Sequence, residues 1–282
     1  EIYTRSLVGS VRCVLETVSS VGAGVDMHSL GDSVAFFKGF GAFAEKIVLP
    51  AQMAFPIPES FPFHVAAGVF MVYGTSYHAL VQRADINKDD EVLVLGAAGG
   101  VGLAAVDIAN SFGARVLAAV STKEKAEVCA GYGVDDVVVY GEEKLNKEGQ
   151  KAFTKELKSK SVRGGFSIIY DPIGDCFAEP ALRSIGWGGT YLVVGFAAGK
   201  IPSFPANLML LKGCAVSGVF IGRFQQEEPK KNTQNLKAIG ELLEGKRLTP
   251  FISETIPMSG CVGAIERIAK RGVVGKIVFV ND

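Results

Sequence analysis

The sequence is poor in the residues that build metal and disulfide sites. Its 282 residues include five cysteines and three histidines. The cysteines are widely spaced and form no CxxC pair, which argues against a disulfide framework and against the usual structural zinc motifs. The histidines lack HExxH spacing, and no ligand pattern surrounds them. We therefore expect no bound metal, although ligands from distant positions can converge in a fold.

The sequence also lacks an excess of charge and a long apolar run. Lys and Arg total 29, and Asp and Glu also total 29, so no basic face for nucleic acid and no acidic tail is expected. The longest apolar stretch, residues 65–81, is broken by two glycines and by polar side chains, which excludes a membrane span. We expect no nucleic-acid or membrane partner and a cytoplasmic location, and the sequence leaves organellar targeting open.

What the sequence does contain is a regular alternation of apolar runs and helix-like segments from residue 91 onward. The runs predict strands at 91–95, 115–120, 136–140, 167–170, 190–194 and 214–220. The segments between and after them predict helices at 101–112, 123–132, 176–184 and 233–243. Strand and helix in repeated alternation predict an α/β fold with a doubly wound parallel sheet and right-handed crossovers.

The two ends of the chain have a different composition. The part before about residue 73 has short apolar runs, many glycines and several prolines, which is typical of a small antiparallel β domain. The tail contains a short helix at 262–270 and a closing strand at 276–280 and is too small to fold alone. We therefore predict one domain from residues 1–75 with 246–282 and a second from residues 76–245.

A cluster of small residues, AAGGVG at 97–102, follows the first predicted strand of the alternating part and opens a helix. The pattern is A-x-G-x-x-G, and its strand-to-helix context is that of a dinucleotide-binding turn. Gly99 lets a pyrophosphate approach the main chain, Gly102 lets the helix pack close to the sheet, and the helix start attracts phosphate. A tight turn without a ligand is the alternative.

The end of the second strand of this part indicates which dinucleotide would bind. An NAD enzyme normally places an acidic residue there, on the ribose hydroxyls. Here Ser121 and Thr122 occupy that place and Lys125 follows one helical turn later. Hydroxyl donors and a cation suit a 2′-phosphate, so the sequence favours NADPH. A solvated helix lysine is the alternative for Lys125.

Several segments together resemble the medium-chain dehydrogenase/reductase superfamily. They are GDSVAFFKGFGAFAEKIVLPA at 31–51, VYGTSYHAL at 72–80, VLGAAGGVGLAAVDIA at 94–109 and GKIPSFPANLMLLKG at 199–213. Within the superfamily they are similar to the zinc-free quinone oxidoreductase branch related to zeta-crystallin, in its quinone oxidoreductase-like subgroup. The resemblance covers nearly the whole chain from about Ser29. It implies a GroES-like β domain split between the two chain ends, a Rossmann domain between them and a nicotinamide cleft at their junction.

The resemblance also assigns residues to the cofactor. It implies that Thr75 lies near the nicotinamide and that Arg271 reaches the cofactor. The remaining expected contacts are, for the pyrophosphate, Ala98, Gly99, Gly100 and Val101; for the 2′-phosphate, Ser121, Lys125 and Tyr140; and beside the cofactor, Gly195 and Phe196. Each of three residues has an alternative: Phe196 could be ordinary core, Tyr140 a strand-end tyrosine with its hydroxyl in water, and Arg271 a cation at a helix C-terminus. The family's first strands have no counterpart before Glu1, so we expect an incomplete β domain and assign no substrate-pocket residue.

The function that these features imply is NADPH-dependent reduction of quinones or other conjugated carbonyls by hydride transfer, without zinc and with no catalytic residue named. An enoyl-thioester or enone reductase and a non-catalytic NADPH-binding protein are the alternatives. A zinc alcohol dehydrogenase is disfavoured by the missing ligands. The apolar strand at 214–220 would lie at a sheet edge, where family members pair across a dimer, so we expect a homodimer.

Overall fold

The structure is a computed structural model that describes residues 13–37, 41, 43–57, 61–270 and 272–281. Its contacts divide the chain into two units. The sheet unit is Tyr73–Thr249, and the split unit comprises the described parts of Leu7–Val72 and of Pro250–Asp282. The chain passes from one unit to the other after Val72 and again after Thr249. The assignment of cofactor and substrate roles to two domains remains a prediction.

The sheet unit is built on one parallel sheet in the strand order β6-β5-β4-β7-β8-β9. The six strands are β4 (Glu91–Leu95), β5 (Arg115–Val120), β6 (Asp136–Val139), β7 (Phe166–Asp171), β8 (Ile185–Val193) and β9 (Ala215–Gly218). The chain starts in the middle of the sheet at β4, runs outward to β6 and returns to β7 on the other side of β4. This reversal is the switch point at which doubly wound sheets bind ligands, beyond the carboxyl ends of the strands.

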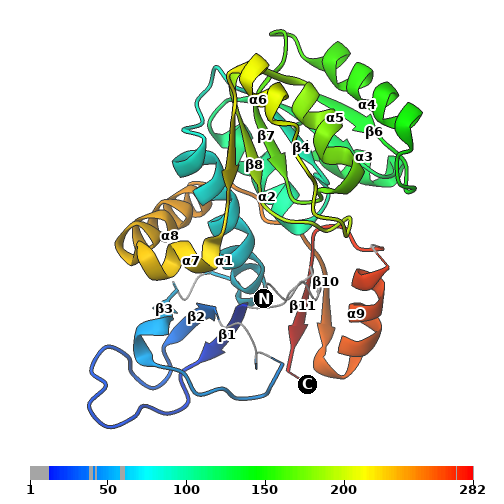
Figure 1. The fold of residues 1–282 in the computed structure, drawn as a ribbon. Coiled ribbons are helices and arrows are strands. Elements are labelled where there is room, and N and C mark those ends of the chain that lie inside the picture. The colour runs from blue at the N-terminus through cyan, green and yellow to red at the C-terminus, as the bar shows by residue number, and fades with distance from the viewer. Residues whose placement is uncertain (1–12, 38–40, 42, 58–60, 271, 282) are drawn as a thin grey trace. The chain divides into compact units, whose positions relative to one another are not determined.

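Helices α2 to α6 connect the strands and cover both faces of the sheet, whereas α7 and α8 follow the last strand and pack against one another (Figure 1). They are α2 (Gly100–Ser111), α3 (Lys123–Gly131), α4 (Lys147–Lys160), α5 (Ala178–Arg183), α6 (Ala206–Lys212), α7 (Ile221–Glu227) and α8 (Pro229–Glu244), with a 3₁₀ turn at Asp175–Phe177. Local signals set several ends: Thr122 and Asn146 cap α3 and α4 through their side chains, and α6 ends at Gly213 in the left-handed conformation.

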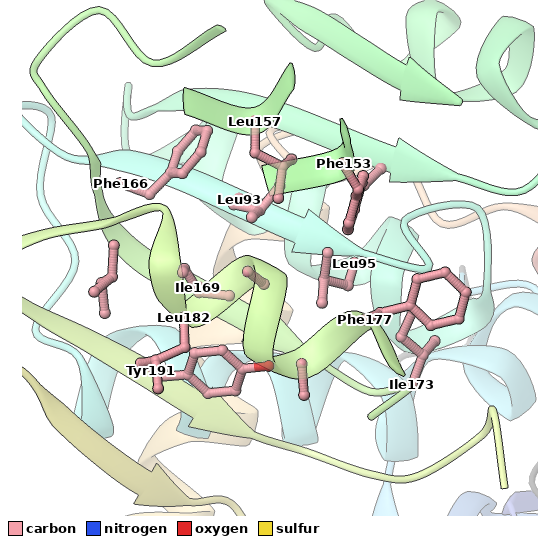
Figure 2. Close-up of a cluster of buried hydrophobic side chains, with 14 of the residues drawn as sticks. Leu93, Leu95, Phe153, Leu157, Phe166, Ile169, Ile173, Phe177, Leu182 and Tyr191 are labelled. Atoms are coloured by element: carbon pink, nitrogen blue, oxygen red, sulfur yellow. The ribbon is translucent and has the colours of Figure 1, made fainter. Parts of the chain in front are cut away.

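The core of the sheet unit shows which helices share a face. Leu93 and Leu95 of β4 belong to one apolar cluster with Phe153 and Leu157 of α4 and with Leu182 of α5 (Figure 2). Since side chains alternate along a strand, Val92 and Val94 point to the opposite face, and α2 packs against β4 and β5. All five residues of β4 are buried, as expected for a central parallel strand.

The split unit contains two small sheets. Strands β1 (Cys13–Thr17), β2 (Ser33–Phe37) and β3 (Ala54–Pro56) pair antiparallel in sequence order. Strands β10 (Ile252–Pro257) and β11 (Lys276–Val280) pair parallel, with α9 (Cys261–Ala269) between them and 3₁₀ turns at Ala51–Met53 and Met258–Gly260. The edge-to-face rings of Phe43 and Phe279, 5.2 Å apart, connect the two ends of the chain within this unit.

The expectation of β structure throughout the first 73 residues is wrong at its end. Residues Phe63–Tyr77 form the helix α1, and a π-helical turn at His78–Arg83 follows it. The apolar residues of this segment run almost continuously, so no helical period marks it, and Pro62 directly precedes the helix rather than a further strand. The alternating pattern also gave no sign of α4, whose exposed face is rich in charge.

Candidate functional site

The glycine turn lies between β4 and α2 and is shaped by close main-chain contacts. Gly96 has a φ of +57°, which favours glycine, and its carbonyl accepts a 3.0 Å hydrogen bond from the Gly99 amide. A Cβ on Gly102 would lie 2.4 Å from the Gly96 carbonyl oxygen and 2.7 Å from that of Ala97. Gly102 is therefore required by the packing of the turn itself.

Gly99 has a different role in the same turn. A Cβ at Gly99 would lie 3.3 Å from the Gly96 carbonyl oxygen and within 4 Å of no other atom considered, so the described chain leaves most of the space around it open. Gly99 is the N-cap of α2, with an extended ψ of 165°, and among the described residues no side chain caps this helix end. The first amide groups of α2 therefore point at a place that a phosphate could occupy.

The ends of β5 and β6 place hydroxyl groups and a cation near this turn. Lys125 Nζ donates a 3.1 Å hydrogen bond to Ser121 Oγ, and the Thr122 hydroxyl accepts from the Lys125 amide at 3.3 Å. The main chain of Tyr140 follows β6 and donates to the Val120 carbonyl at 2.9 Å. Its ring is half-buried and lies 4.6 Å from that of Phe177, so packing accounts for the ring and the hydroxyl remains the group of interest.

The end of β7 carries a buried carboxylate that shapes the next turn. Asp171 Oδ1 accepts 2.8 Å hydrogen bonds from the amides of Ile173 and Gly174, and Oδ2 accepts one of 2.6 Å from the Tyr191 hydroxyl. Burial raises the pKa of the Asp171 carboxyl, and these three hydrogen bonds act against that rise. Burial likewise raises the pKa of Tyr191, and the Asp171 charge adds to the effect. Asp171 thus holds the β7 turn and β8 together.

Gly195 and Phe196 follow β8 and pack against that turn. A Cβ on Gly195 would lie 3.1 Å from the Pro172 carbonyl oxygen, and one on Gly174 would lie 3.1 Å from the Phe196 ring. Phe196 is half-buried. Part of its ring therefore contacts the chain, as the core alternative requires, and part is accessible to solvent.

Thr75 lies near the end of α1 and is buried. Its neighbour Ser76 is fully buried, donates a 2.9 Å hydrogen bond to the Val101 carbonyl and lies 2.9 Å from the Tyr170 hydroxyl. Burial raises the pKa of Tyr170. Through Ser76, the end of α1 is attached to the first turn of α2 and to β7, so Thr75 lies close to the glycine turn.

The structure therefore brings ten of the eleven predicted residues to the carboxyl ends of the strands or to the adjoining end of α1. Arg271 lies outside the described residues. The sequence predictions missed Ser76, Tyr170, Asp171 and Tyr191, which hold the turns in place. Tyr170 and Asp171 carried a signal, because two residues with polar groups directly follow the paired isoleucines at the end of the strand FSIIYD.

The strand order and the glycine turn at the switch point define a Rossmann-type α/β protein. A family model described as zinc-binding dehydrogenase matches residues 100–238. Quinone oxidoreductase-like protein 2 homolog of Nematostella vectensis is 34% identical over 265 residues, covering 93% of this chain and 70% of the relative. Quinone oxidoreductase-like protein 2 of Bos taurus is 34% identical over 269 residues, covering 94% and 73%. The chain belongs to the quinone oxidoreductase-like family of the medium-chain dehydrogenase/reductase superfamily.

Solved structures agree with this membership. A mycobacterial protein complexed with NADPH superposes with a TM-score of 0.87 at 26% identity, covering 99% of this chain and 84% of that one. Within the described ranges, no group of three or more His, Cys, Asp or Glu could hold a metal ion, so these residues do not fit the zinc that the family model's description implies. In the part of the chain that the structure describes, no helix has the length and apolar content to cross a bilayer.

Proposed function

We propose that the chain binds NADPH at the carboxyl ends of the sheet-unit strands and reduces quinones or related conjugated carbonyls by hydride transfer. The observation that carries this proposal is the pairing of an open, uncapped glycine turn with the Ser121–Lys125 hydrogen bond on the neighbouring strand. The NADPH complex of the mycobacterial relative supports the choice of cofactor, and the names of the curated relatives support the choice of acceptor.

The residues present fit the cofactor. Gly99 leaves room for a pyrophosphate where a larger residue would place a Cβ, and the amides of Gly100 and Val101 lie at the helix start, with Ala98 beside them. Ser121 and Lys125 offer a hydroxyl and a cation to a 2′-phosphate, and the Tyr140 hydroxyl is a third candidate contact. Phe196 and Gly195 would flank the cofactor, and Thr75 would face the nicotinamide, which supplies a hydride when bound.

The contribution of the protein to the reaction would be orientation and exclusion of water. Ser76 and Asp171 hold the turns that carry Val101 and Gly174, so the contacts to the cofactor are set before it binds. A reduced quinone takes its protons from solvent, so the proposal needs no general acid. We predict that the split unit binds the acceptor while the sheet unit binds the cofactor. The cytoplasmic location also stays a prediction.

A homodimer through the sheet edge is part of the proposal. Strand β9 is the last in the sheet order, and along its outer side no further strand pairs with it among the described residues. Phe220, just beyond β9, is 73% exposed. An unpaired edge beside an exposed aromatic ring is the kind of surface that a second copy would cover.

The test is NADPH oxidation by the protein with an ortho-quinone, run beside NADH, a 2-enone and crotonyl and longer enoyl thioesters. We expect turnover of the quinone that prefers NADPH. Faster turnover of an enoyl thioester would replace the acceptor class while keeping the cofactor. Tight NADPH binding without oxidation by any acceptor would identify a non-catalytic NADPH-binding protein and refute the proposed reaction.

A further inference from the structure

The two places where the chain leaves the sheet unit are attached to one side chain. The chain crosses between the units at Val72–Tyr73 and again at Thr249–Pro250. The Tyr73 hydroxyl donates a 2.6 Å hydrogen bond to Asp107 Oδ2. The Thr249 amide donates a 2.7 Å hydrogen bond to the same oxygen, and the Thr249 hydroxyl lies 3.4 Å from Asp107 Oδ1. Residues far apart in sequence thus meet at a single carboxylate.

Asp107 lies inside α2, the helix that begins at the glycine turn. Asp107 is 6% exposed and Tyr73 is 3% exposed, so these hydrogen bonds are shielded from water. Burial raises the pKa of the Asp107 carboxyl, and the hydrogen bonds from Tyr73 and Thr249 oppose that rise. Within the described part of the chain, the three donors to the carboxylate come from the two crossing residues.

The ends of α2 and α3 hold the second crossing in further ways. The Tyr132 hydroxyl donates a 2.5 Å hydrogen bond to the Thr249 carbonyl, and Asn110 Nδ2 donates one of 2.6 Å to the Tyr132 carbonyl. The Arg247 guanidinium donates to the Ser111 carbonyl. The segment Arg247–Thr249 is therefore hydrogen-bonded to the sheet unit at both of its ends, and Asp107 is the point at which it meets the first crossing.

An apolar residue could fill the space of Asp107 without the desolvation of a buried carboxylate. An apolar residue could not accept hydrogen bonds from the Tyr73 hydroxyl of the first crossing and the Thr249 amide of the second. We propose that Asp107 is a positioning residue that fixes both crossings to α2. It thereby sets the two points, at Tyr73 and Thr249, from which the chain leaves the sheet unit. The catalytic consequence rests on the proposed function, whereas the structural one does not.

The structural test is amide hydrogen exchange of the full chain, followed at residues 71–74 and 247–250. In Asp107→Leu, the Thr249 amide loses its acceptor, so we expect exchange at this amide to rise at least about tenfold, with strands β4 and β7 unchanged. Asp107→Asn should restore most of the protection, because its oxygen can accept from Tyr73 and Thr249 while its amide donates to the Thr249 hydroxyl. Tyr73→Phe, which removes one bond, serves if the leucine variant does not fold.

The matched control is Tyr191→Phe. It also removes a 2.6 Å hydrogen bond from a buried tyrosine to a buried aspartate of the sheet unit, but away from both crossings. We expect it to leave exchange at residues 247–250 unchanged. Uniformly faster exchange throughout the sheet unit in Asp107→Leu, or crossings as protected as in the wild type, would overturn the proposal.

The catalytic readout is a comparison of NADPH affinity with acceptor KM. Asp107 lies further along α2 than the glycine turn at its start, so we expect Asp107→Leu to keep its Kd for NADPH within about twofold. Because the crossings lead to the unit that is predicted to bind the acceptor, we expect the acceptor KM to rise at least about threefold. A purely structural role would lower the amount of active protein and leave both the Kd for NADPH and the acceptor KM of the remaining active protein unchanged. If the wild type turns over no acceptor, the proposed function fails and the exchange data still decide the role of Asp107. If turnover is normal and neither exchange nor KM changes in the variant, only the role of Asp107 fails.

Discussion

Lys125 Nζ donates a 3.1 Å hydrogen bond to Ser121 Oγ, across the turn that joins β5 to α3. Both residues are half-buried, which keeps the ammonium group close to the strand end rather than extended into solvent. The hydrogen bond places the cation beside the hydroxyl where an NAD enzyme would carry an acidic residue. It does not decide between a 2′-phosphate contact and a solvated helix lysine, which a substitution can distinguish.

Lys125→Glu should weaken NADPH binding far more than NADH binding. A charge-assisted hydrogen bond contributes about 1.5–3 kcal/mol, so we expect the Kd for NADPH to rise roughly tenfold or more, while the Kd for NADH changes little. Titration calorimetry with both cofactors measures the two constants.

The matched control for Lys125 is Lys123→Glu, the same charge change at an exposed position in the first turn of α3. Lys123→Glu should leave the preference for NADPH over NADH intact. An equal loss of both cofactors in Lys125→Glu would remove Lys125 from the 2′-phosphate site.

Two glycines of one turn should respond differently to substitution. Gly99→Val places its Cβ 3.3 Å from one carbonyl oxygen in an extended backbone, so we expect the fold to be retained and cofactor affinity to be lost. Gly102→Ala places its Cβ 2.4 Å from the Gly96 carbonyl oxygen, so the turn itself must move. We expect Gly102→Ala to lower the free energy of unfolding by about 1–3 kcal/mol.

Urea denaturation and NADPH titration of both variants distinguish these two roles. An unchanged Kd for NADPH in a folded Gly99→Val would refute the pyrophosphate assignment. Wild-type stability in Gly102→Ala would show that the close contacts of the turn relax more easily than the structure implies.

Phe220→Glu should separate the proposed dimer. Phe220 is 73% exposed beyond β9, so a charge there does not disturb the core of one chain, but it would have to be buried by a second copy. We expect a dimer for the wild type and a monomer for the variant in sedimentation velocity. Val162→Glu, at an apolar residue that is 67% exposed before β7, is the matched control and should leave the dimer intact. A monomeric wild type would refute the dimer.

Most of the sheet unit could be predicted from the sequence, because buried parallel strands and the helices between them have separate patterns. The predicted bounds of β4 and β5 agree with the structure at every residue, as do those of β11 in the split unit. The segment Phe63–Tyr77 could not be predicted, since a helix that is apolar almost all round has no period to detect.

The candidate site divides in a similar way. Gly99 and Gly102 could be found because only a few residue types permit such a turn, and these occur at fixed spacing. The supporting residues Asp107 and Ser76 could not be found, because their roles depend on partners that are distant in sequence. Asp171 carried a signal as a polar residue at a strand end, but its tyrosine partner on β8 did not follow from that signal. A single aspartate within an apolar helix indicates that a partner exists but does not identify it.

His78 should make stability depend on pH. Its ring stacks on Phe224 with centroids 3.9 Å apart, and its Nδ1 donates a 2.7 Å hydrogen bond to Gln82. Burial lowers the pKa of His78 from its ordinary 6.5; the charge of Arg83 acts in the same direction and the Gln82 hydrogen bond opposes it. The nearby charges of Glu228 and Lys231 have opposing effects.

The unfolded chain therefore takes up the His78 proton more readily than the folded chain, so stability is lost as the pH falls below 6.5 towards the lower folded pKa. His78→Phe retains the stacked ring and cannot titrate. Between about pH 7.5 and about pH 5.5, the free energy of unfolding of the wild type should fall more steeply than that of the variant, as measured by urea denaturation. Because all other titrating groups are shared, the difference between the two curves isolates His78. Parallel curves would mean that the imidazole accepts its proton as easily inside the fold as outside it, and that the stack on Phe224 tolerates the charge.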